Sequence, residues 1–291
     1  PGIKFTYQHN EDVMAYASWT IGYKGGGFDG SLVNSTGILG TIDPQGNPYN
    51  NANPSTIADD SFAFDAEKAT AIEVGFKSTI LEGMGQFNAA YYNTRYEDQQ
   101  VSTWNGTAFV VENASEAKVQ GIELESLFLL TDELMLVANV AWSDFEYSDY
   151  QAGAATIWQQ QIGGTKTQDL TGKTAAFAPD VTGLLGLNHQ IELSDSWLLE
   201  SNLNISYSSD MYTASDLDES SKQDAFTKVN VYFNLSNIEN ENWSFNLSIK
   251  NLTEETVMRT SQDMPANAFA YWATIDNPER TVSLTATYSF Y

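Results

Sequence analysis

The sequence predicts an all-β protein: an antiparallel transmembrane β-barrel of which about eleven strands are present. Apolar and polar residues alternate within short segments. In Trp197–Tyr207 the odd positions are apolar apart from Ser201, and the even positions are polar apart from Leu198. Side chains of a strand alternate between its two faces, so such a segment has one apolar and one polar face. Short and long connections also alternate, which is typical of a barrel with short turns at one rim and long loops at the other.

Six strands are expected in the first half of the chain, each from an alternating segment. Ile72 and Val74 oppose Glu73 in the third strand, and Ile122 and Leu124 oppose Glu123 in the fifth. The fourth strand has aromatic residues at both odd and even positions, so its apolar face is not assigned. The six segments are Gly2–Gln8, Val13–Lys24, Ala69–Leu81, Gln86–Gln100, Lys118–Leu130 and Leu134–Phe145.

Five further strands are expected in the second half. One of them shows the alternation clearly: Phe245, Leu247 and Ile249 oppose Asn246 and Ser248. The same pattern continues to the end of the chain. The five segments are Val181–Glu192, Trp197–Ser208, Phe226–Asn237, Trp243–Asn251 and Arg280–Tyr291.

The connections divide into two classes that take turns along the chain. Short turns are predicted at 9–12, 82–85, 131–133, 194–196 and 239–242. The longer connections are Gly25–Glu67, the loop around Trp104–Thr107, Ser148–Ala178, Ser209–Ala225 and Thr253–Glu279, rich in Gly, Asn, Asp, Ser and Pro. Bacterial single-chain barrels close with an even number of strands. An odd count of eleven therefore predicts the C-terminal part of a larger barrel.

Composition excludes several classes of protein. The net charge of −25 argues against nucleic acid and anionic membrane surfaces as partners. It leaves two interpretations open, simple solubility and cation-bridged contacts at a lipopolysaccharide surface. No cysteine is present, so a disulfide framework, a cysteine metal site and a thiol nucleophile are excluded. No apolar run reaches the ~18 residues that a membrane helix needs.

Six stretches of the sequence resemble the C-terminal half of TonB-dependent outer-membrane receptors. Each is weak alone, but their order along nearly the whole chain is that of the family. They are Tyr16–Phe28, Ile72–Ser78, Asn113–Glu125, Phe177–Pro179, Lys250–Glu255 and Pro278–Phe290.

The resemblance implies a 22-stranded barrel around an N-terminal plug, with residues 1–291 as its C-terminal portion and with the plug and first strands missing. It further implies TonB-energised uptake of a scarce nutrient, most simply a ferric siderophore, across the bacterial outer membrane. The expected partners are outer-membrane lipid and lipopolysaccharide, the plug, TonB and the nutrient. The family usually ends on an aromatic residue in phase with the apolar face; here that residue is Phe290, followed by Tyr291.

Charged residues on the polar faces are expected to point into the lumen, because a Lys or Arg at the lipid midplane costs roughly 2–4 kcal/mol. In the resembling family such residues contact the plug, whereas contact with water alone is the plainer interpretation. The candidates are Glu73, Lys77, Glu123, Glu125, Glu200 and Lys250.

Aromatic residues and arginine of the long connections are candidates for ligand contact, because these residue types dominate recognition surfaces. Anchoring at the membrane rim is an equally good interpretation. The candidates are Trp104, Trp158, Arg259, Tyr271 and Trp272.

No enzyme, cofactor or metal site is predicted. The two histidines, His9 and His189, lie near the short turns without the converging partners of a hydrolase. The acids at Asp59–Asp60 and Asp216–Glu219 lack the spacing of a calcium loop. Two alternatives stay open. One is a complete small barrel, either a passive porin or an outer-membrane enzyme, and the other is a soluble all-β adhesin or carbohydrate-binding module.

Overall fold

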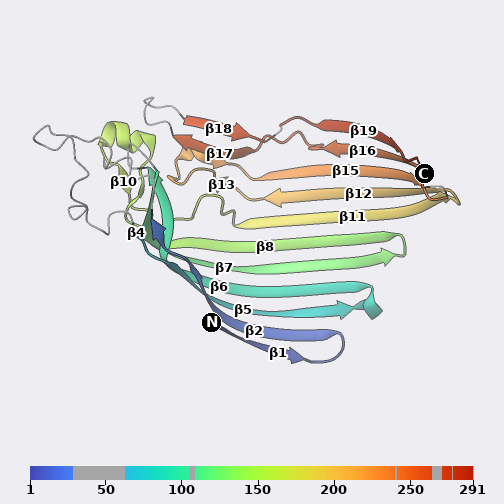
Figure 1. Cartoon of the computed structure of the whole chain (residues 1–291), viewed down its shortest axis with the longest axis horizontal. Coiled ribbons are helices and arrows are strands. Elements are labelled where there is room, and N and C mark those ends of the chain that lie inside the picture. Colours follow the sequence, from blue (N-terminus) through green and yellow to red (C-terminus); the bar gives the residue numbers. More distant parts are fainter. Residues whose placement is uncertain (29–62, 105–108, 240, 264–270, 277, 291) are drawn as a thin grey trace, which may run out of the picture.

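The computed structural model describes residues 1–28, 63–104, 109–239, 241–263, 271–276 and 278–290. One eleven-stranded antiparallel sheet contains most of them (Figure 1), with its strands ordered β1-β2-β5-β6-β7-β8-β11-β12-β15-β16-β19. The strands are β1 (Gly2–Gln8), β2 (Val13–Lys24), β5 (Glu67–Ile80), β6 (Gly85–Trp104), β7 (Phe109–Thr131), β8 (Leu134–Asp149), β11 (Val181–Ser194), β12 (Trp197–Ser208), β15 (Phe226–Asn237), β16 (Trp243–Lys250) and β19 (Thr281–Tyr288). All eleven predicted strands are therefore confirmed.

The two classes of connection lie at opposite ends of the sheet (Figure 1). The five predicted short turns lie at the right of the view, together with the C-terminus; we call this the turn end. The described parts of the longer connections lie at the left, which we call the loop end, and Pro1 is nearer to that end. Each strand pairs with its chain neighbour in the sheet, while β1 and β19 form its two edges. The sheet is an open up-and-down meander and does not close into a barrel.

The strand registers confirm the predicted two-faced character. Val74, Tyr91, Ile122 and Trp142 are successive cross-strand partners and form a row of apolar side chains on one face. One residue along, Glu73 and Tyr92 belong to the opposite, polar face. The register thus assigns the face that the sequence left open in the fourth strand.

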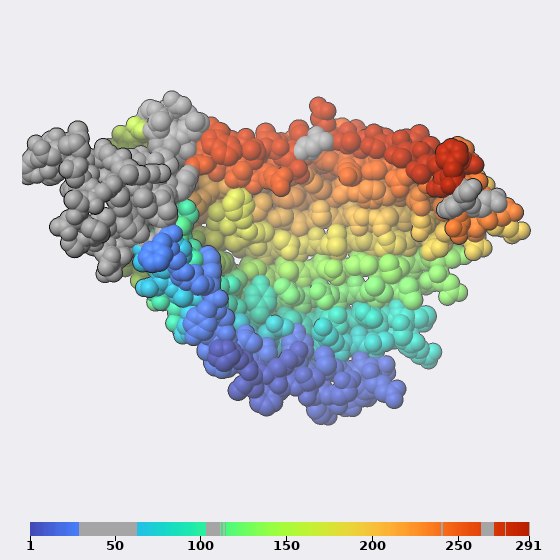
Figure 2. Space-filling view, in the orientation of Figure 1, coloured from blue at the N-terminus to red at the C-terminus, as the bar shows by residue number. Residues whose placement is uncertain are grey.

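Large apolar side chains on the apolar face are exposed rather than buried. Ile72 and Val140 are each 50% exposed, and Leu284 on the edge strand β19 is 76% exposed. Figure 2 shows the strands side by side in one continuous layer. A soluble sandwich would bury these rows against a second sheet, whereas lipid covers them in a membrane barrel.

The height of the apolar face matches a bilayer. On β12 it runs from Trp197 to Tyr207, ten residue steps, which span about 34 Å at ~3.4 Å per residue. Strands of outer-membrane barrels tilt by up to ~45°, which projects this length to about 24 Å, close to the ~25 Å apolar band of such barrels. At the turn end, Trp243 stacks on Phe245 with ring centroids 5.7 Å apart and contacts Tyr288 at 4.7 Å. This cluster is the kind of aromatic girdle expected at an interface.

Several strands are longer than predicted, and β6 and β7 exceed their predicted bounds the most. β6 continues to Trp104 rather than ending at Gln100, and β7 begins at Phe109 rather than Lys118. Both extensions contain β-branched and aromatic residues, but two register shifts between Tyr96 and Gln100 interrupt the alternation that would reveal them. Asp98 has a positive φ of 55° at this bulge. The Asn113 amide donates a hydrogen bond of 2.8 Å to the Asp98 carbonyl.

Four long connections contain short ladders that the sequence analysis treated as loop. These pair β3 (Gly27–Phe28) with β4 (Ala63–Phe64), β9 (Gly153–Ala154) with β10 (Thr167–Gln168), β13 (Met211–Tyr212) with β14 (Lys222–Gln223), and β17 (Met258–Asp263) with β18 (Tyr271–Ile275). Single-turn helices lie at Leu81–Gly83, Gln159–Gly163 and Glu219–Ser221. The ladders are too short for an alternating pattern to identify them. Among the described residues, no helix combines the length and the hydropathy needed to cross a membrane.

Apart from Ala117 on β7, the buried apolar residues of the described part of the chain lie in the connections at the loop end. Ala155, Ile157, Leu170, Ala214 and Val257 are each at most 8% exposed, and none of them belongs to the eleven-stranded sheet. Their parent segments are Ser148–Ala178, Ser209–Ala225 and Thr253–Glu279. The predicted loops are therefore packed structures at one end of the sheet.

Candidate functional site

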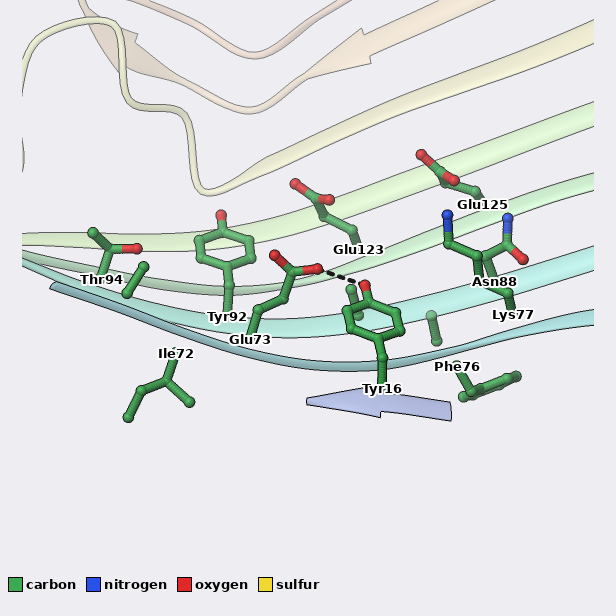
Figure 3. A pocket seen from close by; sticks show the side chains of 13 residues that line it. Tyr16, Ile72, Glu73, Phe76, Lys77, Asn88, Tyr92, Thr94, Glu123 and Glu125 are labelled. Atoms are coloured by element: carbon green, nitrogen blue, oxygen red, sulfur yellow. Dashed lines mark hydrogen bonds between the residues drawn. The ribbon is translucent and has the colours of Figure 1, made fainter. Parts of the chain in front are cut away.

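The polar face of β2, β5, β6 and β7 forms a hollow of about 390 Å³ that we call the acidic hollow. Figure 3 shows its side chains pointing to one side of the sheet, while Ile72 and Phe76 point to the other. The alternation of each strand explains this, because the charged residues occupy positions of one parity. The residues that give the hollow its chemistry are Tyr16, Glu73, Lys77, Asn88, Tyr92, Glu123 and Glu125.

Two tyrosines of the hollow lie over glycines of the neighbouring strand. Tyr16 is the cross-strand partner of Gly75, and Tyr92 is the partner of Gly121. A Cβ on Gly75 would lie 2.8 Å from Cζ of Tyr16, and a Cβ on Gly121 would lie 2.5 Å from Oη of Tyr92. The glycines thus leave the space that the rings occupy.

This arrangement lets each tyrosine hydroxyl reach beyond its direct partner. The Tyr16 hydroxyl donates a hydrogen bond of 2.5 Å to Oε1 of Glu73. The Tyr92 hydroxyl bonds Oγ of Ser143, two strands away on β8, at 3.2 Å. The sequence gives little warning of either contact, because Tyr92 belongs to the strand whose faces the pattern could not assign.

The hollow carries a net negative charge. Three carboxylates (Glu73, Glu123 and Glu125) face one ammonium (Lys77), which gives −3 + 1 = −2. None of the ion pairs found within 4.0 Å in the described part of the chain includes a charged residue of the hollow. The carboxylates are therefore available to a cationic partner, and charge-assisted hydrogen bonds are about twice as strong as neutral ones.

The structure brings together four of the six predicted lumen residues. Glu73, Lys77, Glu123 and Glu125 line the acidic hollow. Glu200 lies on β12, where it accepts a hydrogen bond of 2.8 Å from the Asn234 amide. Lys250 is the exposed last residue of β16. These two share the polar parity but lie in another part of the sheet.

The predicted ligand residues come from separate connections. Arg259 lies on β17, and Tyr271 and Trp272 lie on its partner β18, so these three share one hairpin rather than an unstructured loop. Trp158 lies next to the helical turn Gln159–Gly163 and is 61% exposed. The expectation that Trp104 lies in a loop is wrong, because its backbone ends β6; its side chain lies outside the described residues.

Polar side chains tie these connections to one another. Thr213, which is fully buried, shares a hydrogen bond of 2.9 Å with Ser261 of β17 through their hydroxyl oxygens. The Thr213 hydroxyl also lies 2.8 Å from the Ser221 carbonyl. The Gln168 amide donates to the Asp216 carbonyl at 2.6 Å. Sequence reasoning missed this network, because isolated Ser, Thr and Gln residues carry no periodic signal.

Two carboxylates at the loop end have partners within their own connection. A hydrogen bond from Lys222 lowers the pKa of the Asp210 carboxyl, and the two groups form an ion pair of 3.0 Å. Hydrogen bonds from Thr171 lower the pKa of Asp169. In the part of the chain that the structure describes, no group of three or more His, Cys, Asp and Glu side chains could hold a metal ion. Asp59 and Asp60, also considered as cation ligands, lie outside the described residues.

The model of the family described as TonB dependent receptor-like, beta-barrel, matches residues 1–252. This chain belongs to the TonB-dependent receptor β-barrel family. Members of the family are transport proteins of the Gram-negative outer membrane and not enzymes. The match decides against the outer-membrane enzyme and the soluble adhesin that the sequence had left open.

Solved receptors share the fold of this receptor chain. The ferric yersiniabactin uptake receptor FyuA from Yersinia pestis is 17% identical with a TM-score of 0.70, over 100% of this chain and 37% of that one. The siderophore receptor PiuA from Acinetobacter baumannii is 17% identical with a TM-score of 0.66, over 99% of this chain and 35% of that one. The copper transporter OprC is 14% identical with a TM-score of 0.63, over 99% of this chain and 39% of that one.

The receptor chain spans little more than a third of the length of these solved receptors. No curated protein matches the sequence.

Proposed function

We propose that residues 1–291 are the C-terminal portion of the barrel of an outer-membrane receptor that takes up a scarce nutrient with energy from TonB. The observation that carries the proposal is the family match over residues 1–252 together with the open eleven-stranded sheet. The superposition on FyuA, which covers all of this chain and 37% of that receptor, supports it. The remaining strands and a plug would complete the lumen.

The cargo we propose is a ferric siderophore. Two of the solved receptors described above are named for siderophores, while the third is named for copper. Similarity of fold at such low sequence identity does not determine which cargo a receptor transports. The experiment therefore includes copper as the alternative cargo.

In this proposal the polar face is the lumen wall, and its charged residues contact the plug. The −2 charge of the acidic hollow suits a plug segment with Arg or Lys side chains. Glu200 and Lys250 belong to the same wall. The apolar face contacts lipid, and lipopolysaccharide surrounds the loop end.

Ligand capture is assigned to the loop end. Arg259, Tyr271 and Trp272 share one hairpin, and Trp158 is exposed on a neighbouring connection. The turn end offers only connections of a few residues, too short to enclose a solute.

Uptake and binding measurements on the complete receptor test the proposal. Cells that express it are expected to accumulate radioactive iron from ferric desferrioxamine or ferric citrate only when the proton gradient is intact. Copper(II) chloride serves as the competing cargo. Trp272→Ala and Arg259→Ala are expected to weaken binding by at least about tenfold, since truncation of such contacts costs about 2 kcal/mol.

The matched control is Thr274→Ala on the same hairpin, which should change binding little. Energised copper uptake without iron uptake would show that the cargo is copper and not a ferric siderophore, while the proposal of an energised receptor would stand. Passive accumulation that ignores the proton gradient would overturn the class.

A further inference from the structure

The polar face of the sheet has two sectors with different chemistry. The first is the acidic hollow of β2, β5, β6 and β7. The second, which we call the amide sector, lies on β11, β12, β15 and β16. Six asparagines share this face with Tyr232, the cross-strand partner of Asn202, and the strand registers bring them close together: Asn188, Asn202, Asn204, Asn230, Asn234 and Asn246.

Two hydrogen bonds link asparagines of the sector to one another, and the Asn234 amide donates a third, of 2.8 Å, to the Glu200 carboxylate toward the turn end. The Asn202 amide donates to Asn188, and the Asn204 amide donates to Asn202. Each asparagine has two donor hydrogens and an acceptor oxygen with two lone pairs. These bonds use only part of that capacity, so the amides can also bond a solute.

Formal charges on this part of the polar face are confined to its two ends. Glu192 and Glu200 lie toward the turn end, and Lys228 and Lys250 lie toward the loop end. The Lys228 ammonium is paired with Asp276. The positions between them on β11, β12, β15 and β16 carry no charged residue on the polar face.

The two sectors suit different tasks. A carboxylate holds a cationic group through strong, charge-assisted hydrogen bonds. A neutral amide gives a hydrogen bond of about 0.5–1.5 kcal/mol net, which forms and breaks readily. Passage along a wall requires binding that is favourable enough to enter and weak enough to leave. The acidic sector therefore suits a stationary partner, and the amide sector suits a moving one.

We infer that the cargo passes between the plug and the amide sector, while the plug stays held on the acidic hollow. This inference rests on the proposed function, in which the polar face is the lumen wall. The solute class it implies is a polar molecule whose carbonyl and hydroxyl oxygens can exchange hydrogen bonds with amides, such as an intact organic chelate rather than a bare cation.

Thiol labelling tests the inference without knowledge of the cargo. The chain has no cysteine, so single cysteines can be introduced without background from these residues. Asn204→Cys and Asn246→Cys report on the amide sector. The matched variant is Ala90→Cys, on the polar face of β6 opposite Glu123. The complete receptor is used in intact cells, with any cysteine outside this chain changed to serine, and a cationic, membrane-impermeant methanethiosulfonate reagent is the probe.

Energising the cells is expected to speed labelling of the two amide-sector cysteines by at least about tenfold, equivalent to roughly 1.4 kcal/mol in the free energy of access. The Ala90→Cys receptor should change less than about twofold on the same scale. Faster labelling at Ala90→Cys, equal acceleration at all three positions, or no acceleration at any position would overturn the inference.

Iron uptake measured in the same cells reports separately on the proposed function. Energised uptake with the wrong labelling pattern overturns the cargo path and leaves the function standing. The expected labelling pattern without iron uptake would support the path and reject the iron cargo.

Discussion

The glycine beneath Tyr92 offers the sharpest test of the packing on the polar face. In Gly121→Ala, the added Cβ would lie 2.4 Å from the Trp142 carbonyl oxygen and 2.5 Å from Oη of Tyr92. Both distances are far inside van der Waals contact, so the backbone of β8 and the ring must move. Overpacking of this kind typically costs about 1–3 kcal/mol.

A cost near 2 kcal/mol shifts the unfolding equilibrium about 30-fold, since each 1.4 kcal/mol is tenfold. Gly186→Ala is the matched control, because its Cβ would meet the nearest atoms at 3.5 Å and 3.6 Å, ordinary contact distances. The measurement is the denaturant midpoint of the folded receptor in detergent, followed by the loss of heat-resistant mobility on a gel.

Tyr92 and the Trp142 carbonyl contribute separately to the clash, and a double-mutant cycle separates them. Adding Tyr92→Ser to Gly121→Ala removes the ring but leaves the carbonyl, so we expect partial recovery with a coupling of about 0.5–3 kcal/mol. If Gly121→Ala is as stable as Gly186→Ala, or if the cycle shows no coupling, the proposed packing of ring on glycine is wrong.

Four other outcomes follow from the structure. Leu203→Arg or Leu247→Arg should cost roughly 2–4 kcal/mol and impair folding into lipid, whereas Asn204→Arg and Asn246→Arg should be tolerated; equal tolerance would contradict the assigned faces. Residues 1–291 alone should not give a heat-resistant monomer, because β1 and β19 leave backbone groups unpaired. A stable closed monomer would refute this. Thr213→Val should lower the local stability of the loop-end connections by about 1–3 kcal/mol, because the Ser221 carbonyl and the Ser261 hydroxyl lose a buried hydrogen-bond partner. The expected sign is faster proteolysis of these connections while the sheet stays intact. Lys222 lowers the pKa of Asp210 in the folded protein. The ion pair therefore stabilises the loop fully above the unfolded-state pKa of about 3.9, and this stabilisation is lost as the pH falls through the pKa of Asp210 in the folded protein. Proteolysis of Asp210→Asn should therefore differ from wild type at neutral pH and converge with it in acid.

Strand positions and faces were predictable because the alternation of apolar and polar residues directly indicates which side chains share a face of the sheet. Leu203 and Asn204 show this: neighbours in sequence, they fall on opposite faces. The extension of β6 past Gln100 was not predictable, since two register shifts between Tyr96 and Gln100 interrupt the alternation on which the pattern depends. The hairpin of Arg259 and Trp272 was also missed, because its strands are short and lie among loop-forming residues.

The candidate site likewise has features that the sequence predicts and features that it does not. That Glu73, Glu123 and Glu125 share a face follows from parity, but their convergence in one hollow depends on the register between four strands. Register in turn depends on which strands are neighbours, and only the structure supplies that. The hydroxyl pair of Thr213 and Ser261 joins residues 48 positions apart, a contact that no local pattern encodes.

The tyrosine–glycine pairs also bear on how strand pairing avoids errors. A slip of one residue exchanges the apolar and polar faces and is opposed by the whole hydrophobic pattern. A slip of two residues leaves every side chain on its native face of the sheet, so the hydrophobic pattern does not oppose it. It would, however, place Tyr92 against Val119 or Glu123, and Tyr16 against Glu73 or Lys77, all of which carry side chains where the native partner has none. Two missing Cβ atoms therefore discriminate the native pairing from its nearest alternative during assembly of the sheet.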